Sequence, residues 1–173
     1  MKVWIRADGN EHIGTGHVMR CLAIAEALEA AGVQVCFVMA DDAAAKLVKS
    51  RGKKVRILHT RYDRMEEELP VLTAVMEEEH PDMLLTDSYY VSDAYLERLT
   101  EQVWTAYIDD KSFHSYPVNM IINYNIYGDR SLYHPEPACS LMGAAYAPLW
   151  PEFRNVEYHV REQAEAVLLT TGG

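Results

Sequence analysis

Short apolar runs alternate with helical patterns from residue 3 to residue 125, and this alternation constrains the fold more than any other feature. Runs rich in β-branched and aromatic residues predict strands at 3–5, 33–39, 54–58, 83–86, 103–108 and 120–122. Helices are predicted from about Gly16 to near Gly32 and at 43–50, 64–79 and 91–102. The pattern is therefore β-α-β-α-β-α-β-α-β-β.

Strands that alternate with helices imply right-handed crossovers, so we expect a Rossmann-like α/β fold, with a mostly parallel sheet and helices on both faces. Ligands of such sheets bind beyond the carboxyl ends of the strands, at the switch point of the strand order. Polar residues that directly follow predicted strands should gather on this rim. They are His17, Asp87, Tyr89, Asp109 and Asn123.

A polar loop with glycines at 14 and 16 joins the first strand to the first helix. Gly14 and Gly16 would let the backbone approach a ligand closely, and the start of the helix offers unpaired N–H groups to an anion. His17 lies at this helix start, where the helix dipole favours the neutral imidazole that can accept a proton.

The loop matches neither common phosphate-binding motif. No lysine follows the second glycine, and Met19 stands where a dinucleotide fingerprint has its third glycine. Alternatively, the glycines could simply form a tight turn, and His17 could lie at the helix start without a functional role. Arg6 and Arg20 are candidate phosphate ligands, although Arg20 could equally be a surface residue.

The acidic residues also leave alternatives open. Asp87 could cap the helix that follows it, and Asp109 with Asp110 could hold a divalent metal. No histidine or third carboxylate has a fitting spacing, so a hydrogen-bonding or capping role is preferred and no metal is expected. We interpret the glutamates at 66–68 and 77–79 as a solvated helix face.

Composition excludes several classes of partner. The formal net charge of -10 and the pI near 5.1 argue against nucleic acid and against anionic membrane surfaces. The cysteines at 21, 36 and 139 form no CxxC pair, which favours a reducing compartment, and Cys21 is expected in the core. No apolar run is long enough for a membrane span, so a cytoplasmic protein is expected.

The end of the sequence differs from the rest. Residues 140–150 are apolar with glycine and proline, and residues 165–171 resemble a fresh strand that leads into Gly172 and Gly173. A strand before a Gly-Gly turn is typical of the start of an α/β unit. We therefore expect one domain at 1–164 and the beginning of a second domain at 165–173.

Collinear motifs across most of the chain add a resemblance. They are IRADGNEHIGTGHVMRCLAIAEAL, TDSYYVSDAYLERL, YIDDKSFHSYPVNMIINYN and LMGAAYAPLWPEFR. Together they resemble the N-terminal half of the UDP-sugar hydrolases of pseudaminic acid biosynthesis, an SpsG-like group. This group is similar to the GT-B glycosyltransferases, including the MurG type, whose two Rossmann-like domains enclose a nucleotide sugar.

The resemblance implies hydrolysis of UDP-2,4-diacetamido-2,4,6-trideoxy-β-L-altropyranose to the free sugar and UDP, with inversion. It implies that His17 is the general base and that Tyr89 lies near the sugar and the attacking water. No cofactor is implied, because UDP is already a good leaving group. The substrate-binding candidates are Arg6, Asp8, Gly14, Thr15, Gly16, Arg20, Asp87, Asp109 and Asn123.

The resemblance also implies a partner for this chain, a C-terminal domain that carries most of the UDP contacts. Two rival functions remain open at this point. One is a GT-B glycosyltransferase, in which an acceptor hydroxyl replaces water. The other is a non-catalytic module that binds a nucleotide sugar.

Overall fold

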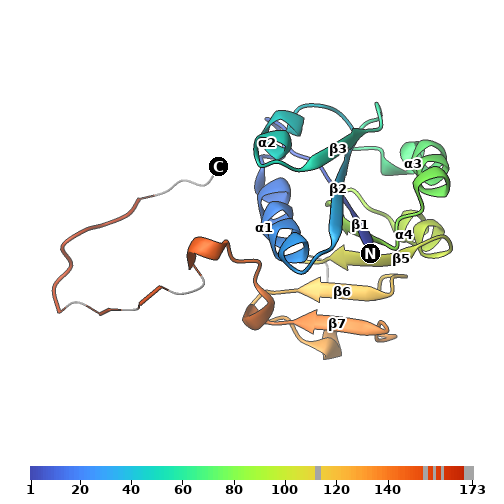
Figure 1. Ribbon diagram of the computed structural model, residues 1–173. Coiled ribbons are helices and arrows are strands. Elements are labelled where there is room, and N and C mark those ends of the chain that lie inside the picture. Colours follow the sequence, from blue (N-terminus) through green and yellow to red (C-terminus); the bar gives the residue numbers. More distant parts are fainter. Residues whose placement is uncertain (112–113, 154–155, 158, 161, 170–173) are drawn as a thin grey trace.

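A parallel sheet of seven strands forms the centre of the molecule in the computed structural model (Figure 1). The structure describes residues 1–111, 114–153, 156–157, 159–160 and 162–169. The strands are β1 (Lys2–Ala7), β2 (Gln34–Met39), β3 (Lys54–Ile57), β4 (Met83–Asp87), β5 (Trp104–Ile108), β6 (Met120–Asn123) and β7 (Cys139–Met142). The helices are α1 (Gly16–Ala30), α2 (Ala45–Ser50), α3 (Met65–Glu79) and α4 (Asp93–Thr100).

The strand order is β3-β2-β1-β4-β5-β6-β7, and every neighbouring pair runs parallel. The chain moves outward from β1 to β3 and then crosses to β4 on the other side of β1. The switch point therefore lies between β1 and β4, where the loops after these strands diverge. These features confirm the predicted Rossmann-like α/β fold.

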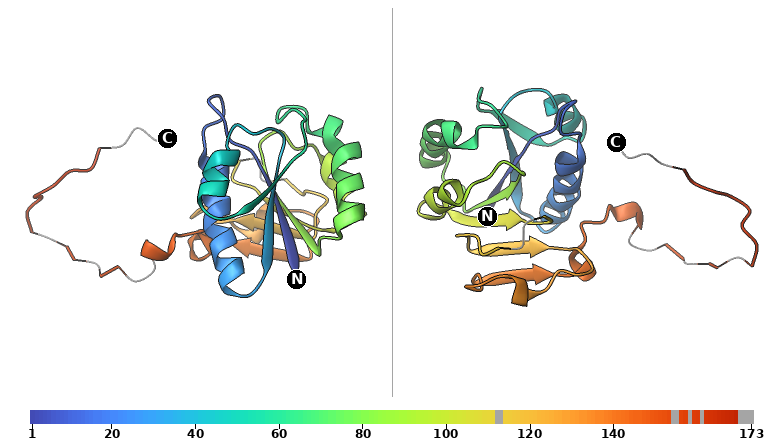
Figure 2. Two further views of the ribbon diagram at one scale, coloured as in Figure 1. Left: turned by 45° about the horizontal axis from the view of Figure 1, so that its top comes forward. Right: turned by 180° about the vertical axis from the view of Figure 1, so that it is seen from behind.

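Helices cover both faces of the sheet, as Figures 1 and 2 show. Helices α1 and α2 lie on one face, where Ile5, Leu22 and Phe37 belong to one buried cluster. Helices α3 and α4 lie on the other, where Trp4 and Leu84 belong to a second cluster. Successive residues of β1 thus face opposite layers, as the alternation of side chains along a strand requires.

The C-terminal part of the sheet differs from the prediction. Strand β7 falls in the apolar segment for which the sequence predicts no strand, and it pairs with β6 from Met120↔Cys139 to Asn123↔Met142. No α-helix lies between β6 and β7, a stretch that the structure describes throughout. The connection from β6 holds only the short 3-10 turn η1 (Arg130–Leu132), and two more such turns, η2 (Ala144–Tyr146) and η3 (Pro151–Phe153), follow β7.

The strand predicted at 165–171 has no counterpart among the residues described there. Residues 165–169 lie in no strand, and residues 170–173 lie outside the described part of the chain. A strand is recognised by its hydrogen-bonded neighbour, so these residues do not test the predicted start of a second domain.

One of the glutamates of α3 is buried, where the sequence predicts a solvated helix face. Of the glutamates at 66–68 and 77–79, Glu68 is 0% exposed, so the interpretation of all of them as a solvated face is wrong. Both carboxylate oxygens of Glu68 accept hydrogen bonds from Arg6, each at 2.7 Å, and Tyr95 donates a third at 2.7 Å. The partner Arg6 lies in β1, far away in the sequence, and its charge offsets the cost of burying the carboxylate.

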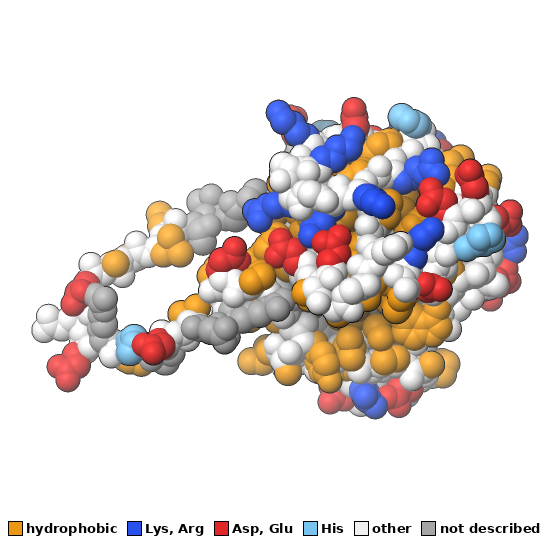
Figure 3. Space-filling model, in the orientation of Figure 1, with side chains coloured by type: hydrophobic (Ala, Val, Ile, Leu, Met, Phe, Trp, Pro, Cys, Tyr) orange, Lys and Arg blue, Asp and Glu red, His pale blue; other side chains and the backbone are white. Residues whose placement is uncertain are grey.

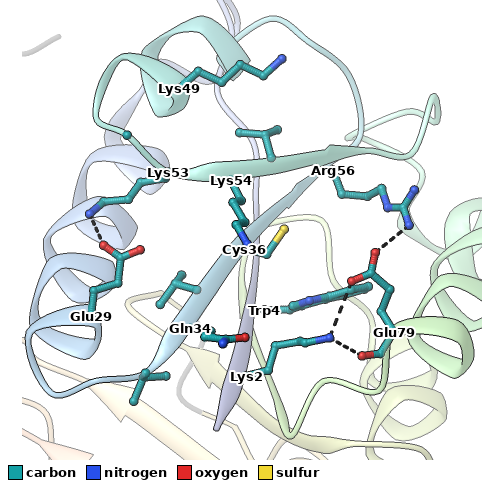
Figure 4. Close-up of a pocket in the computed structure, with 14 residues that line it drawn as sticks. Lys2, Trp4, Glu29, Gln34, Cys36, Lys49, Lys53, Lys54, Arg56 and Glu79 are labelled. Atoms are coloured by element: carbon teal, nitrogen blue, oxygen red, sulfur yellow. Dashed lines mark hydrogen bonds and ion pairs between the residues drawn. The ribbon is translucent and has the colours of Figure 1, made fainter.

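A hollow of about 920 Å³ lies at the opposite end of the sheet from the rim, between the starts of β1 and β2 and the edge strand β3 (Figure 4). Two of the basic side chains that line the hollow form ion pairs. Lys53 pairs with Glu29, and Arg56 pairs with Glu79. The Nζ of Lys2 also bonds the carbonyl oxygen of Glu79 at 2.5 Å, at the end of α3. Cations at helix C-termini stabilise the helix dipole, which accounts for this cluster.

Figure 3 shows the same mixing of charges on the molecular surface, where blue and red side chains alternate over the upper part of the molecule. Within the described residues, no helix is long and apolar enough to cross a membrane.

Candidate functional site

His17 and Asp87 meet at the switch point of the sheet. His17 lies in the first turn of α1, after the loop from β1, and Asp87 is the last residue of β4. Nδ1 of His17 lies 2.7 Å from Oδ1 of Asp87. Both residues are buried, with exposed fractions of 6% and 1%. The predicted gathering of these two residues on the carboxyl rim is confirmed.

The charge of Asp87 determines which ring nitrogen of His17 carries the proton. Burial opposes ionisation of Asp87, but hydrogen bonds from Arg20 and His17 outweigh it and hold the pKa of the carboxyl below its usual range. An ionised carboxylate only accepts hydrogen bonds, so Nδ1 of His17 donates to Asp87 at 2.7 Å, and the longer 3.0 Å contact between Nδ1 and a terminal nitrogen of Arg20 then joins two donors and is no hydrogen bond. Nε2 is then the basic nitrogen, and no described residue forms a hydrogen bond with it.

Arg20 lies one turn further along α1 and forms hydrogen bonds with three residues of the site. Its Nε donates to Oδ2 of Asp87 at 2.5 Å, and a terminal nitrogen donates to Oδ1 of the same carboxylate. The other terminal nitrogen donates to Asp110 at 2.5 Å and to the hydroxyl of Tyr124 at 2.8 Å. The alternative that Arg20 is a surface residue is wrong, since its side chain is only 13% exposed.

Every nitrogen of the Arg20 guanidinium therefore has a partner in the protein. A planar fork of this kind holds a carboxylate in one orientation. The structure gives Arg20 a positioning role towards Asp87, and its predicted contact with a phosphate stays a prediction. Asp87 does not cap the following helix, because the side chain of Ser92 accepts the capping hydrogen bond from Tyr95.

Tyr89 stands over this group from the loop after β4. Its ring lies edge-on to the His17 ring, with centroids 4.5 Å apart. Its hydroxyl donates to Oδ2 of Asp110 at 3.2 Å, and Nζ of Lys111 lies 4.6 Å from the centre of its ring. Partial burial and the neighbouring Asp110 raise the pKa of Tyr89, so it remains a neutral donor near pH 7.

Asp109 and Asn123 lie deeper than the sequence suggests. Both are 0% exposed, and both bind the hydroxyl of the buried Tyr133, each at 2.9 Å. The preferred hydrogen-bonding role of Asp109 is confirmed, since it also accepts from the backbone N–H of Lys111 at 3.1 Å. Their predicted contact with a substrate stays a prediction, because neither side chain reaches solvent in this structure.

Arg6 and Asp8 form the floor beneath the glycine loop. Arg6 is 0% exposed and donates to Asp8 at 2.5 Å as well as to Glu68. Burial outweighs the effect of Arg6 and raises the pKa of Asp8, which also accepts from the backbone N–H of Ala40 at 2.8 Å. These contacts tie the ends of β1 and β2 together, and they place Arg6 inside the protein and away from a ligand surface.

The structure of the glycine loop is compatible with both a tight turn and a ligand-binding loop. Gly14 has a φ of 68°, a conformation that favours glycine, so a tight turn accounts for this residue. The same turn borders a hollow of about 700 Å³, whose far wall includes Ala44 and Leu47. Thr15 lines this hollow too, and its side chain forms no capping hydrogen bond to α1. The N–H groups at the start of α1, from Gly16 onward, are thus free of a side-chain cap.

Two residues of the site, Asp110 and Tyr124, have partners that the local sequence does not indicate. The sequence predicts a hydrogen-bonding or capping role for Asp110 without naming its partners, and the structure places it between Arg20 and Tyr89. Tyr124 lies two residues after the predicted strand at 120–122, and that position is its one available signal. Within the described residues, no three His, Cys, Asp or Glu side chains form a group that could hold a metal ion.

The sequence matches no protein-family model and no curated protein. Among solved structures, the fold is similar to that of Acinetobacter baumannii MurG in its crystal structure, with a TM-score of 0.54. The match covers 71% of this chain and 41% of the MurG chain, at 14% identity. This chain thus spans less than half of that protein. At this identity the likeness concerns the fold alone: the chain has the fold of the N-terminal half of a MurG-like GT-B protein.

Proposed function

We propose that this chain is the N-terminal domain of a UDP-sugar hydrolase and that His17 is its general base. The observation that carries the proposal is the pair of His17 and Asp87 at the uncapped start of α1, on the rim where α/β sheets bind ligands. A base oriented by a buried carboxylate is the arrangement that proton abstraction requires.

The proposed reaction uses the two nitrogens of the His17 ring in different ways. Nε2 of His17 takes a proton from water as the water oxygen bonds to the anomeric carbon of the sugar. The bond from that carbon to the phosphate oxygen breaks, and UDP leaves with the electron pair. Asp87 stabilises the imidazolium that forms, because its carboxylate accepts the hydrogen bond of Nδ1. Attack from the face opposite UDP inverts the anomeric centre.

The choice of substrate rests on the motif resemblance. It favours a UDP-linked 2,4-diacetamido-2,4,6-trideoxy hexose of pseudaminic acid or related surface polysaccharide biosynthesis. The uncapped start of α1 supports an anionic or sugar ligand at this place. We further propose that a C-terminal domain supplies most of the UDP contacts, since Arg6 and Arg20 are engaged by carboxylates of this chain.

The likeness to the MurG fold supports a second candidate, a GT-B glycosyltransferase. The same base would then take the proton from a hydroxyl of an acceptor sugar. The two candidates differ in their product, since a hydrolase releases free sugar without an acceptor.

Turnover of the UDP-sugar by the complete protein that contains this chain tests the proposal. His17→Asn should lower kcat by about 10²-fold or more if His17 is the base. His80→Asn is a matched control, because His80 is exposed at the end of α3 with a φ of 50°, a conformation that asparagine tolerates. Near-normal turnover by His17→Asn would refute the role of His17. Consumption of UDP-sugar only when an acceptor is present would establish the transferase instead.

A further inference from the structure

Two tyrosines beside the site remain without a role in the proposed reaction. Tyr90 follows Tyr89 in the loop after β4 and is 42% exposed, and Tyr62 lies in the loop between β3 and α3. Their ring centroids are 5.5 Å apart at an interplanar angle of 81°. Tyr90 is exposed and Tyr62 is half-buried, so part of this aromatic pair stays open to solvent beside the rim.

The strand order gives this pair its position. Strands β3 and β4 are separated by β2 and β1, so their ends lie about 14 Å apart in the sheet. The contact between Tyr62 and Tyr90 joins the loops that follow these two strands. The pair therefore bridges the loops at the carboxyl ends of β3 and β4, and Tyr90 directly follows Tyr89, whose ring lies edge-on to His17.

Local hydrogen bonds hold the loops that carry both tyrosines. The backbone N–H of Tyr90 donates to the hydroxyl of Ser88 at 3.1 Å. The turn that carries Tyr62 is closed by a hydrogen bond from Arg64 N to Arg61 O, and Arg61 pairs with Asp63 through both carboxylate oxygens. Fixed aromatic rings bind a ligand with a smaller loss of side-chain entropy than mobile ones.

The base of the Tyr62 loop is tied to the floor of the site. Thr60 Oγ1 donates to Oε2 of Glu68 at 3.3 Å, and the same oxygen accepts from Arg6 at 2.7 Å. Arg6 in turn binds Asp8 at the end of β1. The loop and the rim therefore rest on one buried ionic network.

We propose that Tyr62 and Tyr90 form a stacking subsite for the sugar ring of the substrate. This inference rests on the proposed function, which places a nucleotide sugar at His17. Rings at nearly a right angle form a corner, and the negative face of a tyrosine ring attracts the C–H bonds of a pyranose. The arginines that flank Tyr62 in the sequence are paired with carboxylates: Arg61 binds Asp63, and Arg64 binds Glu67. A neutral sugar ring therefore fits this corner better than a diphosphate.

Kinetics of the complete protein give the first test. The double substitution Tyr62→Ala and Tyr90→Ala should raise KM for the UDP-sugar by about tenfold or more and leave kcat little changed. The phenylalanine double variant keeps both rings and should retain the original KM. Trp104→Leu is the control for removal of an exposed aromatic ring, since Trp104 begins β5 at the opposite end of the sheet. An unchanged KM in the alanine double variant would overturn the subsite.

A binding measurement separates this inference from the reaction. We would label the tyrosines of the complete protein with fluorine, assign the signals of Tyr62 and Tyr90 with the single phenylalanine variants, and titrate methyl β-N-acetylglucosaminide or UDP. Shifts of both signals with the glycoside and not with UDP would support the subsite, even if His17→Asn retained turnover and so refuted the base. Shifts of the pair with UDP alone, or with neither compound, would refute the subsite even if His17 proved essential.

Discussion

Oδ1 of Asp87 lies 2.7 Å from Nδ1 of His17 and also accepts a hydrogen bond from Arg20. One carboxylate thus orients the imidazole and is itself oriented by the guanidinium. Because the contact fixes the proton on Nδ1, the opposite nitrogen of the ring is left as the base.

Asp87→Asn should lower kcat of the complete protein by about 10²-fold or more. An asparagine amide can donate to Nδ1, which moves the ring proton to Nε2 and removes the base. Steady-state turnover of the UDP-sugar measures the effect, with circular dichroism to show that the variant is folded. A folded Asp87→Asn variant with normal kcat would mean that Asp87 does not set the tautomer.

The stability of the protein should fall in acid partly because of Asp87. Its pKa is below the usual value in the folded state, so its contribution is present above the unfolded pKa of about 4 and is lost as the pH falls through the folded pKa. Urea unfolding between pH 7 and pH 3 measures this. The difference in unfolding free energy between the unmodified protein and Asp87→Asn should shrink as the pH falls. A constant difference would contradict the lowered pKa.

Arg20→Met should move the acid limb of the kcat/KM profile upward by about one pH unit or more. Without the guanidinium, burial raises the pKa of Asp87, and the carboxylate is lost at a higher pH. Arg20→Lys keeps a charge but not the planar fork, so it should give an intermediate shift. A loss of activity with no change in the pH profile would point to a purely structural role, or to contact with substrate.

Glu68→Gln should lower the free energy of unfolding by about 3–5 kcal/mol, because it leaves the buried Arg6 without its bidentate partner. The neighbouring Glu66 is exposed, and Glu66→Gln should change the free energy by at most about 0.5 kcal/mol. Urea unfolding at neutral pH compares the two variants. Equal stabilities would show that the Arg6 and Glu68 pair contributes little.

The first strands and helices were predictable because each carries a local signal. Strand β1 has a continuous apolar run, and α1 has a buried stripe with Val18, Cys21 and Leu22. Those signals fixed the parallel sheet and the rim of His17 and Asp87. Strand β7 was missed because the residues of Cys139–Met142 include two polar or small side chains in a segment rich in glycine and proline, with no helix before it.

The contacts of the site were harder to predict, because they join residues far apart in the chain. Glu68 has the same local sequence as its exposed neighbours, and only the position of Arg6 on β1 distinguishes it. Arg20 donates hydrogen bonds to Asp110, ninety positions away in the sequence, and to Tyr124, which follows β6. Local pattern cannot supply such pairs, since they depend on the strand order.

Helix α1 joins two charged regions of the molecule, with Gly16 at the rim and Ala30 next to the lysine-lined hollow. Its 15 residues give a length of about 22 Å. Ionic screening at physiological salt reduces the field of an exposed charge over about 8 Å. Lys53 at the far end is neutralised by its ion pair with Glu29, and the length of α1 exceeds this screening distance, so Lys53 contributes little to the field at His17 at physiological salt.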